Sequence, residues 1–240
     1  MLSVYFTGRS HELEAFASFF FGDSTTSTSF PKRAAIHGMP GIGKTQTALK
    51  FADLNRAKFS AVFWTSAVNS IKLSQAYDRI AELLDLPEKS RTEQHVRVNA
   101  VKRWFSNQST DTDGKSWLLI LDNVDKDNIR DVFEFLPASG AKGGSILFTT
   151  RSHEASARLV GTSGLSVELK KMDNEEGIEL LLSASEIGER DTLTLSKALN
   201  IVSSTGSLPL VLDQLAFIAR EAQGGLDTCA KHIEENKAMV

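Results

Sequence analysis

Cysteine is almost absent from this 240-residue sequence, with Cys229 as its single example. One cysteine cannot form a disulfide within the chain, so we expect a buried thiol in a reducing compartment. No apolar run approaches the roughly 20 residues that cross a bilayer, and we predict no membrane span. The first residues include early acids and no signal-cleavage pattern. Together these absences predict a cytoplasmic protein.

A strong charge of either sign is also missing. The chain has 27 Lys and Arg residues against 30 Asp and Glu residues, a net charge of −3. This balance excludes a chain built to coat nucleic acid or an anionic membrane, so we expect neither as a partner. Hydrophobic residues are 41% and charged residues 24%, which are ordinary globular proportions and exclude extensive disorder.

Short apolar segments alternate with segments of helical spacing in the first two thirds of the chain. This alternation predicts an α/β fold with a five-stranded, mostly parallel sheet flanked by helices. An amphipathic helix is expected over about 10–21, and a polar Ser/Thr-rich loop over 23–31. The five expected strands are 34–37, 61–65, 117–121, 146–149 and 165–169.

After about residue 171 the sequence has helical spacing and no strand candidate. We therefore expect two domains. The first is the α/β domain over 1–170, which includes an N-terminal segment and helix over 1–33, and the second is a helical subdomain over 171–240. A helix is expected over 207–222, with Ser207 as its N-cap, Pro209 in its first turn and Gly224-Gly225 as its stop, and a fourth helix is expected from about Asp227. Glu175 and Glu176 look like a solvated helix start.

Residues 38–45 read Gly-Met-Pro-Gly-Ile-Gly-Lys-Thr and match the phosphate-loop pattern G-x-x-x-x-G-K-[ST] at every fixed position. A strand candidate precedes them and a helical run over 45–53 follows, which is the context that the motif requires. Glycines let backbone N–H groups surround phosphate, while Lys44 would reach the β- and γ-phosphates and Thr45 would bind Mg²⁺. The expected nucleotide-binding residues here are Met39, Pro40, Gly41, Ile42, Gly43, Lys44, Thr45 and Gln46.

An apolar strand over 118–121 ends in Asp122, a second candidate for the Mg²⁺ site. The alternative is a turn residue. Asn123 stands where many ATPases carry a second acid, and Asn cannot take a proton. Asp125 is the remaining candidate to orient water, and the favoured alternative is an N-cap or Asx-turn before the helix expected over 127–136.

The strand over 146–149 leads through Thr150 to Arg151, whose guanidinium could bind a γ-phosphate bidentately. The alternative is a surface arginine at the end of the sheet. The candidate catalytic residues are thus Lys44, Asp122, Asp125 and Arg151.

These motifs together resemble the NB-ARC/NOD type of STAND ATPases, found in plant and fungal immune receptors (NLRs) and in animal apoptosome proteins. The segment Phe6-Thr7-Gly8-Arg9, followed by Glu12 and Leu13, is similar to the family's N-terminal Gly-Arg motif. Segment 62–64 resembles its second strand, and segment 146–151 its Thr-Thr-Arg sensor. Segment 207–210 resembles its Gly-Leu-Pro-Leu motif, with serine in place of the first glycine, a change expected to matter little.

The resemblance implies a sheet order of 5-1-4-3-2 and a site for ADP or ATP with Mg²⁺. It implies adenine contacts from Phe6, Thr7, Arg9, Pro209 and Leu210. It also implies a signalling switch, in defence or cell death, that self-associates on activation. Effector and sensor domains would lie outside this chain. The family's winged-helix subdomain and its Met-His-Asp motif are not found before Val240, so we expect either a piece of a larger fungal-like receptor or a short member.

Two other functions stay open. One is a turnover ATPase of the AAA type, against which Asn123 argues because efficient hydrolysis needs a dependable acid. The other is the ATPase module of a STAND transcription regulator, whose DNA-binding domain would have to lie outside this chain. A GTPase is disfavoured because the guanine-binding Asn-Lys-x-Asp pattern is missing.

Overall fold

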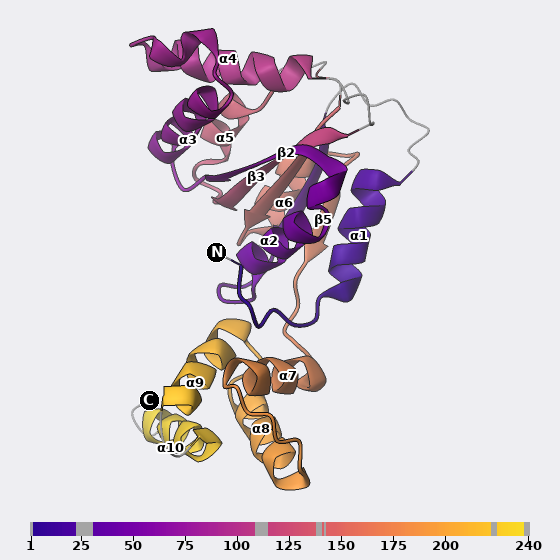
Figure 1. The fold of residues 1–240 in the computed structure, drawn as a ribbon, viewed down its shortest axis with the longest axis vertical. Helices are drawn as coiled ribbons and strands as arrows, with labels where there is room; N and C mark the ends of the chain where they lie inside the picture. The colour runs from indigo at the N-terminus through magenta and orange to yellow at the C-terminus, as the bar shows by residue number, and fades with distance from the viewer. Residues whose placement is uncertain are drawn as a thin grey trace. The chain divides into compact units, whose positions relative to one another are not determined.

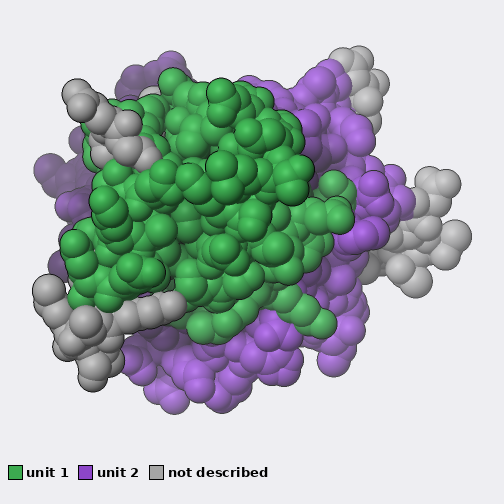
Figure 2. Space-filling view, turned by 90° about the horizontal axis from the view of Figure 1, so that it is seen from below, with its two compact units in different colours: residues 1–10, 39–46, 169–240 green, residues 11–38, 47–168 purple. Residues whose placement is uncertain are grey.

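The computed structural model describes residues 2–22, 31–108, 115–137, 141, 143–221 and 225–237. The chain divides into two compact units, coloured separately in Figure 2. Unit 1 comprises residues 1–10, 39–46 and 169–240, and unit 2 comprises residues 11–38 and 47–168. The polar loop expected over 23–31 lies outside the described residues except for Pro31.

Unit 2 is built on a five-stranded parallel sheet with the order β2-β3-β4-β1-β5. Read from the other edge, this is 5-1-4-3-2, so the predicted order is confirmed. Each expected strand is present, and its ends differ from the predicted ones by three residues or fewer. The strands are β1 (Lys32–His37), β2 (Phe59–Ser66), β3 (Ser116–Val124), β4 (Ser145–Thr150) and β5 (Leu165–Glu168).

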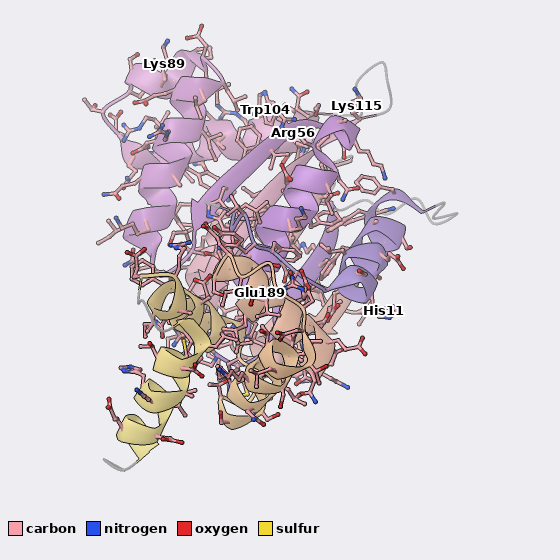
Figure 3. All side chains as sticks on the ribbon, turned by 60° about the horizontal axis from the view of Figure 1, so that its bottom comes forward. His11, Arg56, Lys89, Trp104, Lys115 and Glu189 are labelled. Atoms are coloured by element: carbon pink, nitrogen blue, oxygen red, sulfur yellow. The ribbon has the colours of Figure 1, made fainter. Side chains whose placement is uncertain are left out.

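The central strands are buried on both faces, as expected for a parallel sheet that helices cover. Residues 117–121 of β3 are each exposed by 1% or less, and every residue of β4 is buried. One face packs against α3 (Ser70–Leu83), α4 (Gln94–Asn107), α5 (Ile129–Phe135) and α6 (His153–Val160). Aromatic rings fill this layer: Phe105 lies 4.6 Å from Trp117 between centroids, and Trp104, labelled in Figure 3, packs edge-on against Phe63.

The opposite face carries α1 (Ser10–Phe21) and α2 (Lys44–Leu54), as Figure 1 shows. Phe51 of α2 is fully buried and lies against Phe16 and Phe20 of α1. Burying one such ring stabilises the fold by about 1.5–3 kcal/mol. The C-terminus of α1 is fixed by the Lys32 ammonium, which donates to the carbonyls of Phe19 and Phe20. Two short 3-10 turns, η1 (Arg56–Lys58) and η2 (Pro87–Ser90), complete unit 2.

Four helices form the bundle of unit 1: α7 (Asn174–Ala184), α8 (Thr192–Ser204), α9 (Pro209–Glu221) and α10 (Gly225–Lys237). Their apolar faces form a separate core around Leu181, Val202 and Leu212. Cys229 is fully buried in this core, as predicted for its side chain, and its thiol lies 3.0 Å from the Leu215 carbonyl. Burial raises the pKa of the Cys229 thiol, so the group stays protonated. No helix in the described part of the chain is long and apolar enough to cross a membrane.

The predicted N-cap role of Ser207 is wrong. Ser207 donates its N–H to the Val202 carbonyl, and Gly206 donates to Ser203, which is the hydrogen-bond pattern of a Schellman motif at the end of α8. Both residues have positive φ, 67° for Gly206 and 55° for Ser207, so serine carries strain where the family has glycine. The next helix begins at Pro209, the favoured first position for proline. Gly225, predicted as part of the stop after α9, is instead the first residue of α10. Helix α6 is an additional element for which no range was predicted.

Candidate functional site

The phosphate loop follows β1 directly and leads into α2. Gly38, Gly41 and Gly43 adopt φ values of 143°, 75° and 96°, a region that glycine enters without steric cost. A backbone with such φ values can direct successive N–H groups toward one point, where together they bind an anion. At the end of the loop, the first N–H groups of α2 carry the positive end of the helix dipole, which favours an anion there. The loop therefore fits a phosphate group.

Lys44 lies across this loop. Its ammonium donates to the Met39 carbonyl over 2.8 Å, and the Ile42 N–H donates to the same oxygen over 3.4 Å. The charge is thus held at the loop, where a phosphate-binding lysine is needed. Thr45 is the second residue of α2, and the next side chain, Gln46, accepts from the backbone N–H of Ser3 over 2.8 Å.

The loop also contacts the start of α9 within unit 1. The Leu210 N–H donates to the Gly41 carbonyl over 3.2 Å. A Cβ on Gly41 would lie 3.2 Å from the Leu210 side chain, and one on Gly43 would lie 4.0 Å from Pro209. The structure therefore brings the Leu-Pro-Leu motif against the phosphate loop, although about 165 residues separate them.

Arg9 joins the N-terminal Gly-Arg motif to the same loop. It is 5% exposed, and its guanidinium donates to the carbonyls of Lys170, over 2.8 Å, and Ile42, over 3.2 Å. Phe6 and Thr7 are half-buried in the same segment, and the Thr7 hydroxyl lies 3.4 Å from the Tyr5 carbonyl. Contact of this motif with adenine stays a prediction.

Asp122 lies at a β-bulge near the end of β3. The register of β3 with β4 shifts between Leu121 and Val124, and Asn123 has a φ of 64°. The buried Thr149 hydroxyl donates to Asp122 Oδ1 over 2.5 Å and accepts from the Asn123 N–H over 2.8 Å. One hydroxyl therefore holds both the candidate carboxylate and the backbone beside it.

Asp125 and Arg151 lie in two fixed turns of unit 2. Asp125 Oδ1 accepts from the Lys126 N–H over 2.6 Å, and the Asp125 N–H donates to Asn128 Oδ1 over 2.8 Å, which favours the turn interpretation of this residue. Arg151 is exposed directly after β4. The Ser152 N–H donates to the Thr150 hydroxyl, and Ser152 caps α6, so the backbone on both sides of Arg151 is held.

Comparison with known proteins gives a match to the NB-ARC domain over residues 26–189. The chain belongs to the NB-ARC family. A "Nucleotide-binding leucine-rich repeat (NLR)-like protein" from Hyaloscypha variabilis is 31% identical over 201 residues, covering 77% of this chain and 19% of the relative. The chain thus spans about a fifth of the length of that relative.

Solved structures show the same fold. A STAND protein with a tetratricopeptide repeat sensor from Pyrococcus horikoshii matches with a TM-score of 0.57 and 16% identity, over 98% of this chain and 33% of that one. A Drosophila ORC structure matches with a TM-score of 0.64 and 15% identity, over 98% and 61%. Cdc6p from Pyrobaculum aerophilum matches with a TM-score of 0.58 and 14% identity, over 91% and 65%. By family match and by fold, the protein is a P-loop NTPase of the NB-ARC type.

Sequence reasoning missed one residue of this NB-ARC site. Glu176 is half-buried rather than solvated, and its Oε1 accepts from the Arg9 N–H over 3.2 Å. It also forms a capping box with Asp173 at the start of α7. The pattern Asp-x-x-Glu signals such a box, but the contact with Arg9 has no local signal.

Proposed function

We propose that this NB-ARC chain is the adenine-nucleotide-binding switch module of an NLR-type receptor, with slow or no hydrolysis on its own. The observation that carries the proposal is the phosphate loop, with its left-handed glycines and Lys44 held across it. Two contacts support the loop from within unit 1, Arg9 at Ile42 and Leu210 at Gly41.

In this proposal the motif residues have distinct roles. Lys44 binds the β- and γ-phosphates, and Thr45 and Asp122 hold Mg²⁺, which neutralises phosphate charge when bound. Arg151 reads the γ-phosphate with its planar guanidinium. Phe6, Thr7, Arg9, Pro209 and Leu210 bind the adenine side.

Slow hydrolysis follows from Asn123. An amide cannot act as a general base, a contribution usually worth about 10²–10⁴ in rate. The competing function is a turnover ATPase. The similarity in fold to ORC and Cdc6 proteins is the reason for testing it. Phosphate release at saturating ATP separates the two, since turnover enzymes commonly reach about 1 per second or more. Release far below that rate supports the switch, and release at or above it supports the turnover ATPase.

The wider role is also part of the proposal. ADP would favour one state of the receptor and ATP another, and the shift depends only on the difference in affinity between the two states. We place the receptor in the cytoplasm, with self-association on activation and with effector and sensor domains outside this chain. Defence or cell death as the output rests on the resemblance to NLR proteins.

Calorimetric titration with ADP and with ATP, each with and without Mg²⁺, tests this function. Lys44→Ala should weaken binding by about 10- to 100-fold, because a charge-assisted hydrogen bond contributes about 1.5–3 kcal/mol. Lys72→Ala, an exposed lysine on α3, makes the same change in charge and should bind as the wild type does. Equal affinity of the Lys44→Ala and Lys72→Ala variants would contradict the proposal, as would a wild type that binds no adenine nucleotide.

A further inference from the structure

The N-terminal residues 2–10 of unit 1 contact both the phosphate loop and the helix bundle. The Ser3 N–H donates to Gln46 of α2. The Tyr5 hydroxyl donates to Glu186 over 2.7 Å and accepts from Arg220 over 3.3 Å. Arg9 reaches the loop at Ile42. This segment therefore links elements that lie far apart in sequence.

The last turn of this segment has an unusual backbone. Gly8 and Arg9 both have positive φ, 72° and 65°. Such a conformation is costly for arginine and persists only where its surroundings impose it. With this backbone, the buried Arg9 guanidinium donates to two main-chain carbonyls. One is in the phosphate loop, at Ile42, and the other is at Lys170, just before the bundle.

Glu176 contacts the backbone of this turn directly. Its Oε1 accepts the Arg9 N–H, and a Cβ on Gly8 would lie 2.1 Å from the same oxygen, so only glycine allows the carboxylate this close. Its Oε2 accepts the Asp173 N–H over 3.3 Å, while the Glu176 N–H donates to Asp173 Oδ1 over 2.8 Å. The carboxylate is thus fixed to α7 on one side and to the Gly8-Arg9 turn on the other.

We infer that Glu176 is a positioning residue for the phosphate loop, acting through the backbone of Gly8-Arg9 and the guanidinium of Arg9. The inference rests on the proposed nucleotide-binding function, which it deepens. It makes nucleotide affinity depend on whether residues 2–10 are seated on the bundle. By reciprocity, bound nucleotide should hold those residues in place.

Two variants in the same capping box separate this role from helix capping. Glu176→Ala removes the acceptor for the Arg9 N–H, whereas Asp173→Ala removes the cap of α7 and leaves that acceptor in place. Both should lower the melting temperature. Glu176→Ala should weaken ADP binding at least about fivefold, the lower end of usual coupling between sites, and Asp173→Ala should leave affinity unchanged. Glu176→Gln keeps one carbonyl acceptor and should recover most of the affinity.

Hydrogen exchange without nucleotide supplies a second measurement. Residues 2–10 and 39–46 should exchange faster in Glu176→Ala than in Asp173→Ala. If Glu176→Ala binds ADP as tightly as Asp173→Ala, or if exchange in those segments is the same in both, the inference is overturned. A wild type that binds no adenine nucleotide would refute the proposed function, while the exchange comparison would still decide whether Glu176 positions the loop.

Discussion

Thr149 is the residue on which the local geometry of Asp122 depends. Its hydroxyl makes two hydrogen bonds at the β3 bulge, to the Asp122 carboxylate and from the Asn123 N–H. Val has the shape of Thr without the hydroxyl, so Thr149→Val would remove both of them. Asp122 is half-buried, and a hydrogen bond to a charged group contributes about 1.5–3 kcal/mol. We therefore expect Thr149→Val to lower the free energy of unfolding by about 2 kcal/mol, measured by urea denaturation.

Thr149→Ser provides the matched control. It keeps the hydroxyl and loses one methyl group, which costs about 1 kcal/mol. The prediction is therefore an order, with Val more destabilising than Ser. The reverse order would mean that Thr149 acts by packing alone and would remove the structural support for Asp122.

Residues within a continuous motif could be predicted, and residues that act across the fold could not. The phosphate loop can be recognised from the sequence because its glycines, lysine and threonine lie within eight positions. Glu176 contacts Arg9 across 167 positions, and only the folded chain shows that pair. Ser207 was misassigned for a related reason, since Ser is a common N-cap and nothing nearby in sequence reveals its positive φ.

At the scale of elements, α7 and α8 approach closely at Gly177. A Cβ there would lie 2.7 Å from the Val202 side chain, which is stiff at χ1. Overpacking costs about 1–3 kcal/mol, whereas alanine gains about 1 kcal/mol over glycine in a helix. We expect Gly177→Ala to lower the free energy of unfolding by about 1 kcal/mol. Gly188→Ala, where a Cβ meets nothing within 4 Å, should be neutral or slightly stabilising.

Thermal or urea unfolding of the two glycine variants decides this point. If Gly177→Ala were as stable as Gly188→Ala, the two helices would have room to separate, and the close packing described for the bundle would be wrong.

Strands were easier to predict than helices in this chain. Each strand is an apolar run with polar or glycine neighbours. Parallel strands that are buried on both faces are apolar along almost their whole length, so such runs predict them well. Helix α6 is only eight residues long, about two turns, so apolar residues that recur over several turns do not mark it in the sequence. Its N-cap, Ser152, is a local signal for the start of a helix.

At the scale of the whole chain, the two units do not follow a single cut in the sequence. The last segment of unit 1 begins near the predicted boundary, at 169, but it is grouped with residues 1–10 and 39–46. Such grouping depends on long-range hydrogen bonds such as Arg9 to Lys170 and Leu210 to Gly41. A division into a nucleotide-binding domain over 1–170 and a helical subdomain over 171–240 stays a proposal.

The proposed function depends on which nucleotide the phosphate loop binds, and the nucleotide that co-purifies with the protein identifies it. Protein purified without added nucleotide is denatured, and what it releases is identified by ion-exchange chromatography, with Lys44→Ala treated in parallel. We predict an adenine nucleotide, chiefly ADP, in near-stoichiometric amount from the wild type and little from the variant. Release of a guanine nucleotide, or equal release from both proteins, would contradict it.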